Sequence, residues 1–205
     1  MGKDGAFPKH SCLAFGSIKN LKIMKNAIFD KITPDEALVI LKEITKTDKK
    51  LKMKIIELAE YLFRDVDVEA VCDDVFYALD GIDVHELWDR AGSKTDGYTS
   101  PEDMSVEMFE EEIDPFLQEL YRLFDLKMHQ EAKLYCMGIL KGIYKYDEDS
   151  GSEFKDWATD VPGESFGYIL SEWKKKGINK TDKKEMKDFI GDECRNWSKW
   201  ALNQI

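Results

Sequence analysis

"TPDEALVILKEITKTDKKLKMKIIELAEYL", residues 33–62, decides the fold class of this chain. It opens with a capping box, in which Thr33 and Glu36 flank a proline at the first helical position. Apolar residues then recur every three or four positions, as they do on one face of a helix. Thr47 or Asp48 caps a second helix with the same spacing. The stretch therefore predicts two amphipathic helices in series, which bury Ala37, Leu38, Leu41, Ile44, Leu51, Ile55, Leu58, Ala59 and Leu62.

The same signals of a helix start recur along the rest of the chain. Asp67, Asp83 and Ser100 each stand where an N-cap residue belongs, and Ser152 is placed to cap a later helix. Asp114-Pro115 either kinks a helix or begins a new one. Because strand-like alternation is nearly absent, we expect an all-α protein of roughly nine to eleven helices joined by short loops, without strands.

The spacing of the helix starts suggests how the helices are arranged. Thr33, Asp67 and Ser100 are 34 and 33 residues apart, an interval that is typical of helix-pair repeats. We therefore expect an α-solenoid-like or irregular array of helices. A compact helical bundle is the alternative.

The net charge of −11 is unevenly distributed along the 205 residues. Residues 1–64 carry 13 Lys and Arg against 8 Asp and Glu, so +5, and residues 173–205 carry 9 against 5, so +4. Residues 65–172 carry 8 against 28, so −20. An acidic centre repels nucleic acid and favours basic partners, and the basic ends make a second copy of the chain one candidate partner. The alternative is that the acidic helices only keep the protein in solution.

Other bulk features concern domains and compartment. No apolar run approaches membrane-spanning length, and the N-terminal residues lack the continuous apolar core of a secretory signal. The four cysteines show no metal-binding or redox spacing, so we expect reduced thiols in the cytoplasm. We expect a loose N-terminal segment, residues 1–16, followed by a single helical domain, residues 17–205.

The run "HELWDRAGSKTDGYTSPEDM", residues 85–104, is the most distinctive candidate for a site. His85 and Asp89 share a helix face with the spacing of a metal-binding pair. Asp89 stands where a second histidine would be needed, and Glu86 is explained as the capping-box partner of Asp83. We therefore expect no metal site, no catalytic residue and no cofactor here, and interpret the run as a corner between two helices.

Large aromatic and arginine side chains are the best candidates for contact with a partner, because such residues dominate the energetics of protein interfaces. They are Trp88, Arg90, Tyr98, Trp197 and Trp200. For the three residues of the corner the alternative is structural: Trp88 and Tyr98 pack under the loop, and Arg90 pairs with a nearby carboxylate. For the two tryptophans of the last helix, the alternative is the core between helices.

Two stretches resemble known helical proteins. "LKMHQEAKLYCMGILKGIY", residues 126–144, resembles the second helix of a tetratricopeptide repeat, with Ala132 at the small position and Tyr135 after it, although the other signature positions are absent. "LWDRAGSKTDGY" (87–98), "YCMGILKGIY" and "SEFKDWATDVP" also resemble an uncharacterised helical region of some archaeal SWIM zinc-finger proteins.

The second resemblance covers residues 68–173, about half of the chain. The Cys-x-Cys and Cys-x-His pairs of the SWIM finger are absent, so no zinc or DNA-binding residue is carried over. What the resemblance implies is a helical module that accompanies other domains.

These observations favour a non-enzymatic helical scaffold or adaptor that binds another protein or peptide, with a basic partner preferred. One alternative is an enzyme or small-ligand protein in which His85, Asp89, Arg90 and Tyr98 converge on one pocket. A weaker alternative is an accessory protein that associates with nucleic acid through its basic ends.

Overall fold

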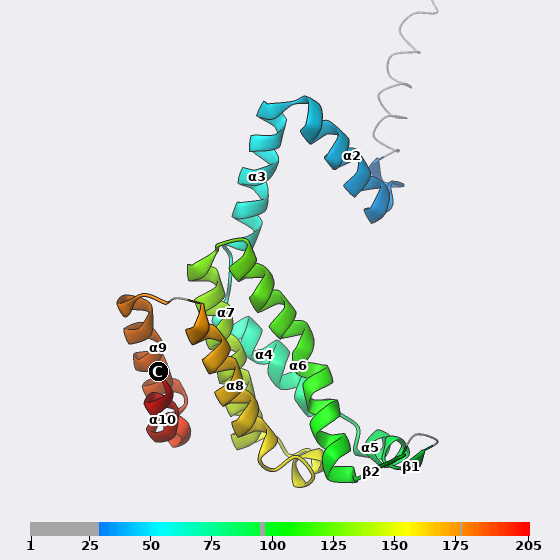
Figure 1. Ribbon diagram of the computed structural model, residues 1–205, viewed down its shortest axis with the longest axis vertical. Coiled ribbons are helices and arrows are strands. Elements are labelled where there is room, and N and C mark those ends of the chain that lie inside the picture. The colour runs from blue at the N-terminus through cyan, green and yellow to red at the C-terminus, as the bar shows by residue number, and fades with distance from the viewer. Residues whose placement is uncertain (1–28, 95–96, 177) are drawn as a thin grey trace, which may run out of the picture. The chain divides into compact units, whose positions relative to one another are not determined.

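The computed structural model describes residues 29–94, 97–176 and 178–205, and within them the all-α prediction is confirmed. These residues form nine α-helices, two short 3-10 turns and one small hairpin (Figure 1). The helices are α2 (Pro34–Thr47), α3 (Lys49–Phe63), α4 (Val68–Asp80), α5 (Val84–Arg90), α6 (Pro101–Asp125), α7 (His129–Asp149), α8 (Val161–Lys175), α9 (Lys180–Glu193) and α10 (Arg195–Ala201). The predicted loose segment, residues 1–16, lies outside the described residues.

The chain divides into two compact units, residues 1–60 and 61–205. The boundary between the two units falls inside α3, which is a continuous helix. The single helical domain over residues 17–205 stays a prediction. The two units are described separately below.

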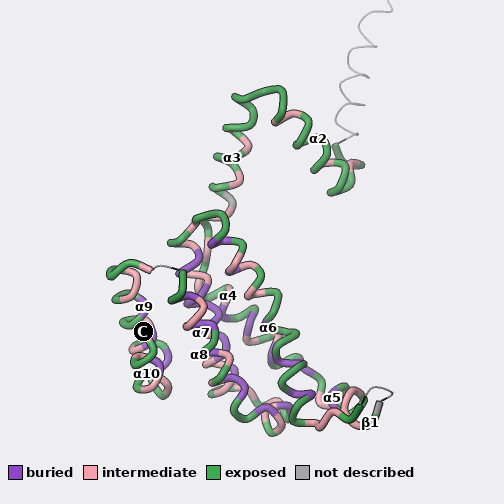
Figure 2. The backbone as a smooth tube through the Cα atoms, viewed as in Figure 1, coloured by how far each residue is buried: buried purple, intermediate pink, exposed green. Residues whose placement is uncertain are grey.

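The first unit contains α2 and most of α3. Thr33 caps α2 as predicted: its side chain accepts a hydrogen bond from the Glu36 N–H, and the Glu36 carboxylate accepts one from the Thr33 N–H. Asp48 ends α2 and caps α3, where its carboxylate accepts hydrogen bonds from Lys50 and Leu51. The predicted burial of the apolar positions is wrong in α2, which has no buried residue (Figure 2).

The second unit is built around α7, which packs against α4, α6, α8 and α9 (Figure 1). Its closest neighbour is α4, and two glycines of α7 make that approach feasible. A Cβ atom on Gly138 would lie 2.6 Å from the Val71 Cβ, and one on Gly142 would lie 2.6 Å from the Val75 Cβ. The valines of α4 thus occupy the space that side chains on α7 would fill.

This arrangement is a bundle, the alternative that the sequence left open. In a solenoid each helix pair contacts its sequence neighbours, whereas the main partner of α4 is α7, three helices further along the chain. The core consists mainly of apolar side chains from α4, α6, α7 and α8, and it includes Phe109, Tyr146, Phe166 and Trp173. The regular spacing of helix starts therefore does not correspond to stacked helix pairs in this unit.

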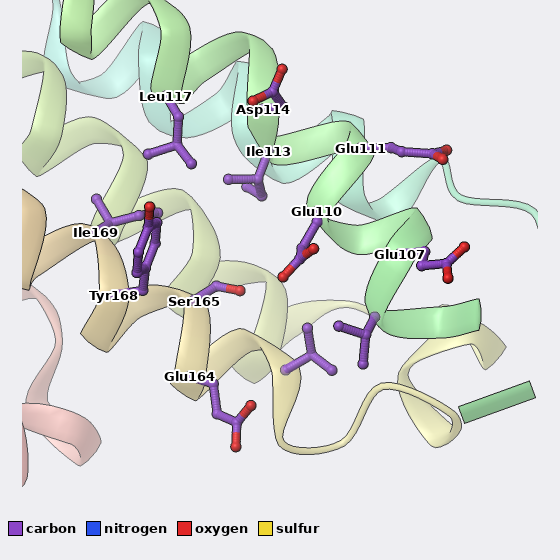
Figure 3. A pocket seen from close by; sticks show the side chains of 12 residues that line it. Glu107, Glu110, Glu111, Ile113, Asp114, Leu117, Glu164, Ser165, Tyr168 and Ile169 are labelled. Atoms are coloured by element: carbon purple, nitrogen blue, oxygen red, sulfur yellow. The ribbon is translucent and has the colours of Figure 1, made fainter. Parts of the chain in front are cut away.

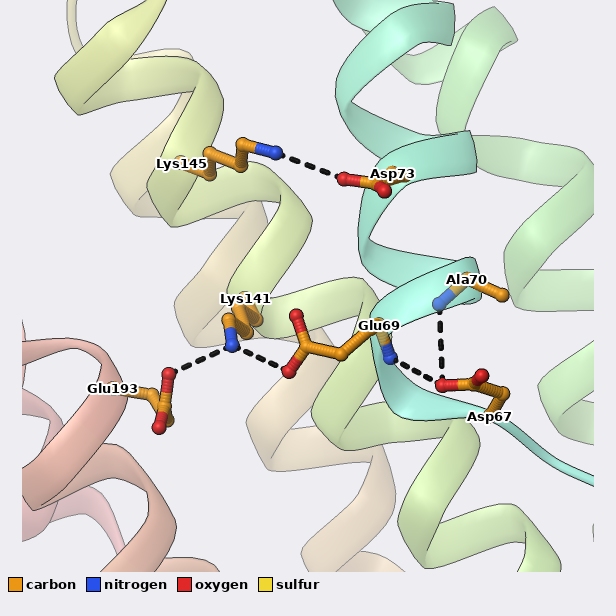
Figure 4. A network of polar contacts seen from close by, with 7 residues as sticks. All are labelled: Asp67, Glu69, Ala70, Asp73, Lys141, Lys145 and Glu193. Atoms are coloured by element: carbon orange, nitrogen blue, oxygen red, sulfur yellow. Dashed lines mark hydrogen bonds and ion pairs between the residues drawn. The ribbon is translucent and has the colours of Figure 1, made fainter.

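Lysines of α7 add polar links to the neighbouring helices (Figure 4). Lys141 Nζ lies 2.6 Å from Glu69 Oε1 on α4 and 2.7 Å from Glu193 Oε2 on α9. Lys145 Nζ lies 2.8 Å from Asp73 Oδ1, also on α4. These contacts connect three helices that are distant in sequence.

Lys133 is the buried lysine of α7. Its side chain is 2% exposed, and its ammonium group pairs with Asp182 at 2.8 Å and with Glu185. Both carboxylates belong to α9, so this contact holds the first turns of α9 against α7. Burial lowers the pKa of Lys133, but the hydrogen bonds to Asp182 and Glu185 outweigh it, so the net shift is upward and the group stays charged.

The connection between α5 and α6 corrects the expectation that the chain has no strand. Strands β1 (Gly92–Lys94) and β2 (Gly97–Thr99) form an antiparallel hairpin in which Ser93 pairs with Tyr98. Each strand has three residues, too few to show alternation in the sequence. Gly92, with φ +98°, and Gly97, with φ +149°, adopt backbone conformations that side chains disfavour.

Two predicted helix boundaries were resolved by the structure. Pro115 lies inside α6, which continues unbroken to Asp125. Pro115 is exposed, so the backbone carbonyl that it leaves without a partner can be hydrated by water. Ser152 caps only a 3-10 turn, Glu153–Asp156, and not a helix as expected.

The thiols of the second unit are buried. Cys72, Cys136 and Cys194 are free cysteines in the interior. Burial raises the pKa of Cys72 to about 11 and that of Cys194 to about 12, which keeps both thiols protonated. In the described part of the chain, no helix is both long enough and apolar enough to cross a membrane.

Candidate functional site

The sequence left open whether Arg90 contacts a partner or its own chain. In the structure, Arg90 pairs with a carboxylate of its own chain. Its Nη1 and Nη2 atoms donate to the two carboxylate oxygens of Glu111 at 2.7 and 2.6 Å. Glu86, for which we predicted a capping-box role, instead lies 3.6 Å from the same guanidinium. The hydrogen bond from Arg90 lowers the pKa of the Glu111 carboxyl, so this bidentate pair joins α5 to α6.

The two aromatic side chains of the corner are placed differently from each other. Trp88 packs edge-on against Trp157, with ring centroids 4.7 Å apart, and it remains 50% exposed. Tyr98 on β2 is 69% exposed. Of the two rings, Trp88 therefore has an aromatic partner, whereas Tyr98 faces solvent.

The corner does not form a shielded pocket. His85, Asp89 and Tyr98 are exposed, and Arg90 is committed to Glu111. The backbone N–H of His85 donates to Asp83, which caps α5 as predicted. Among the residues that the structure describes, no group of three or more histidine, cysteine or carboxylate side chains is arranged to hold a metal ion.

Trp197 and Trp200 on α10 lie half-buried in an aromatic cluster. The Trp197 ring meets Tyr144 of α7 at 5.4 Å and Phe166 of α8 at 5.3 Å, and Trp200 meets Phe166 at 5.7 Å. The cluster therefore attaches α10 to α7 and α8. The structural role accounts for the buried faces of these two tryptophans, while their outer parts border an open hollow beside Asp160 and Glu164.

Another cavity of the second unit lies between α6 and α8 (Figure 3). It is an open groove of about 780 Å³. Its apolar lining combines three residues of α6 with two of α8, namely Val106, Ile113, Leu117, Val161 and Ile169. None of the residues that we singled out from the sequence lines this groove.

Carboxylates also line the α6/α8 groove. Four come from α6 and one from α8, namely Glu107, Glu110, Glu111, Asp114 and Glu164. The α6 carboxylates are spaced by three, one and three residues, which places them along the same side of the helix. Figure 3 shows Glu110 directed toward the space between α6 and α8, and Glu107 and Glu111 directed away from α8. Like charges at this spacing destabilise a helix by about 0.2–0.5 kcal/mol per pair.

Most of this charge lacks a cationic partner. Within the described ranges, Glu111 is the one groove carboxylate that has an ion pair, with Arg90. Asp114 accepts a hydrogen bond from the Gln118 side chain at 3.1 Å. At the end of the groove, the Tyr168 and Tyr121 hydroxyl oxygens lie 3.4 Å apart, and Tyr121 also donates to Glu172 at 3.4 Å.

This combination determines what the groove can bind. Apolar side chains at the base favour an apolar surface, and the carboxylates at the rim favour cations placed beside that surface. The sequence analysis did not predict the groove. One of its two sides, the row of carboxylates on α6, could have been identified from the sequence. The other side, α8 lying opposite, depends on tertiary packing.

Comparison of the chain with protein-family models, with curated proteins and with solved structures finds no match. The resemblance to the archaeal SWIM-associated helical region therefore stays a prediction, as does the likeness to a tetratricopeptide helix.

Proposed function

We propose that this protein is a non-enzymatic helical adaptor that binds a basic segment of another protein in the α6/α8 groove. The observation that carries the proposal is a set of five carboxylates beside an apolar lining, four of which have no ion pair within the described ranges. In the free protein these carboxylates are hydrated, but their like charges repel one another along α6. A cationic partner would relieve this repulsion, which supports the proposal.

The dimensions of the groove favour a helical partner. Along α6 it extends from Val106 to Leu117, which at 1.5 Å per residue is about 16 Å, or three helical turns. A partner helix with apolar residues at every third or fourth position would place them on the base of the groove. Lysine or arginine side chains flanking that stripe would then reach the carboxylates.

The setting that we infer for this activity is cytoplasmic. Three free, buried cysteines fit a reducing compartment. The same acidic surface disfavours nucleic acid, whose phosphates would be repelled by it. We do not propose a reaction, since the groove lining supplies carboxylates and apolar side chains for recognition.

A designed peptide tests the proposal directly. The probe is a fluorescent amphipathic helix with a leucine stripe flanked by lysines, and binding to the full chain is measured by fluorescence anisotropy. We expect binding that weakens as salt is added, because the contacts at the rim are exposed. A scrambled peptide with the same composition but no stripe should bind at least about tenfold more weakly, since it cannot match the apolar base.

A pair of protein variants with equal charge change locates the site. Glu107→Lys with Glu110→Lys alters the groove, whereas Glu112→Lys with Asp125→Lys alters α6 away from it. We expect the groove variant to raise the Kd at least about tenfold and the control to raise it less than about threefold. Equal weakening by both variants, or no binding to the unaltered chain, would refute the proposal.

A further inference from the structure

Apolar side chains of the first unit are uncovered to an unusual extent. The α2–α3 arm, residues 34–60, has exposed large apolar residues on both helices, including Val39 at 60% and Leu58 at 55% (Figure 2). Four of them, Leu38 to Leu41, are consecutive. None of residues 29–60 is buried. Such a surface is characteristic of an interface.

The two helices of the arm cannot cover each other as an antiparallel hairpin. Helical hairpins use connections of about two to five residues, whereas Asp48 alone separates Thr47, the last residue of α2, from Lys49, the first residue of α3. Asp48 also caps α3, which fixes the chain direction at this point. The connection is a corner, and among the described residues none from 34 to 60 is buried.

Each helix of the arm carries an apolar stripe with charged residues along its edge. On α2 the stripe is Ala37, Leu41 and Ile44, and glutamates stand next to its first and last residues, at positions 36 and 43. On α3 the stripe is Leu51, Ile55 and Leu58, and lysines stand next to its first two residues, at positions 52 and 54. Lys42 beside Leu41 and Glu57 beside Leu58 carry the opposite charges, so the flanks of the α2 stripe are acidic on balance and those of the α3 stripe basic on balance.

We propose that the α2–α3 arm pairs with the arm of a second copy of this chain, with α2 of each copy lying on α3 of the other. The arm contains both halves of a complementary surface but cannot bring them together within one chain. A two-fold axis brings both together at once, because α2 of the first copy meets α3 of the second and the reverse contact forms by symmetry. The result is a closed four-helix assembly.

Charge complementarity favours this occupant over a chemically unrelated partner. In the pairing, Glu43 of one copy approaches the lysines that border the α3 stripe of the other. Its present partner is Lys46 of its own helix, an exposed contact that contributes little and is easily exchanged. The groove proposed above lies in the other unit, so this inference goes beyond the proposed function and can fail independently of it.

Sedimentation velocity of the full chain at a series of concentrations tests the pairing. We expect a reversible monomer–dimer equilibrium. Leu58→Glu should weaken the dimer at least about thirtyfold, because Leu58 lies in the α3 stripe. Met53→Glu is the matched control: Met53 is 56% exposed on the opposite side of α3, and its change should leave the dimer intact. Circular dichroism confirms that both variants keep their helices.

Mixing charge-reversed chains gives the decisive result. Lys52→Glu with Lys54→Glu in one chain, and Glu43→Lys in another, should each prevent self-association. Their mixture should dimerise, because each α2 then meets an α3 of opposite edge charge. A monomer at every concentration, a dimer equally sensitive to Leu58→Glu and Met53→Glu, or a failure of the mixture to dimerise would overturn the inference.

Discussion

The guanidinium of Arg90 and the carboxylate of Glu111 form a two-bonded pair that joins the corner after α5 to the rim of the α6/α8 groove. One residue of this pair was a contact candidate in the sequence, and the other lines the cavity that the structure reveals. Arg90 therefore offsets part of the negative charge of the groove without lying in it.

Replacing Arg90 should strengthen the binding of a basic peptide. Arg90→Gln frees the Glu111 carboxylate, so we expect the Kd to fall by about twofold to threefold at low salt. The pair is partly exposed, so unfolding free energy should drop by less than about 1 kcal/mol. Arg122→Gln is the control, because Arg122 pairs with Glu119 of its own helix, outside the groove, and its loss should leave the Kd unchanged.

Because α4 approaches α7 closely, replacing a glycine by alanine should destabilise the protein at this contact and stabilise it elsewhere. Gly142→Ala places a Cβ atom 2.7 Å from the Cys72 backbone oxygen, so we expect a loss of about 1–3 kcal/mol in urea unfolding. Gly191 lies inside α9 with no atom near its added Cβ. Gly191→Ala should therefore stabilise the protein by about 0.4–1 kcal/mol, and a loss of similar size in both variants would contradict the role of the α4–α7 contact.

Replacing Lys133 by alanine should lower the free energy of unfolding far more than replacing an exposed lysine does. Lys133→Ala leaves Asp182, whose side chain is 15% exposed, without its cation, and we expect unfolding free energy to fall by about 2–4 kcal/mol. Lys175→Ala removes a lysine whose side chain is 65% exposed and pairs within α8. That control should change unfolding free energy by less than about 0.5 kcal/mol; thermal and urea unfolding give both values.

Stability should decline in alkali from about pH 9, where the thiols of the unfolded chain begin to lose their protons. Burial raises the pKa of Cys72 from 9.0 to about 11 and that of Cys194 from 9.0 to about 12, so unfolded thiols lose protons at a lower pH than folded ones. Their contribution is complete below about pH 9 and is lost as pH rises through the folded values. Urea unfolding between about pH 8 and pH 11 should show this decline. Cys194→Ala should make it shallower, and a flat profile for the unaltered chain would contradict the assignment.

Local features of the fold were predictable because they depend on nearby residues. The N-caps at Thr33, Asp67, Asp83 and Ser100 all formed as expected, since each cap needs only a side chain and the next two or three backbone N–H groups. The continuation of α6 through Pro115 was not decidable from local signals. It depends on packed residues on both sides, such as Ile113 and Leu120, which hold the helix together.

The site was harder to predict than the fold. Unusual residue types drew attention to the corner at Trp88, Arg90 and Tyr98, where the structure finds an ion pair and one ring contact. The groove instead uses ordinary residues whose importance arises only when α8 lies beside α6. Its acidic stripe could be found from spacing alone, by asking which helix side gathers carboxylates that have no lysine or arginine four residues away.

The pairing of α4 with α7 also has a consequence for how the chain is made. Glu69 and Lys141, which join the two helices, are 72 residues apart. At about 5–20 residues per second, a ribosome needs about 4–14 seconds to add that length. Throughout that interval, Val71 and Val75 of α4 lack the surface at Gly138 and Gly142 of α7 against which they pack in the fold. The newly made segment therefore remains accessible to chaperones until α7 has been synthesised.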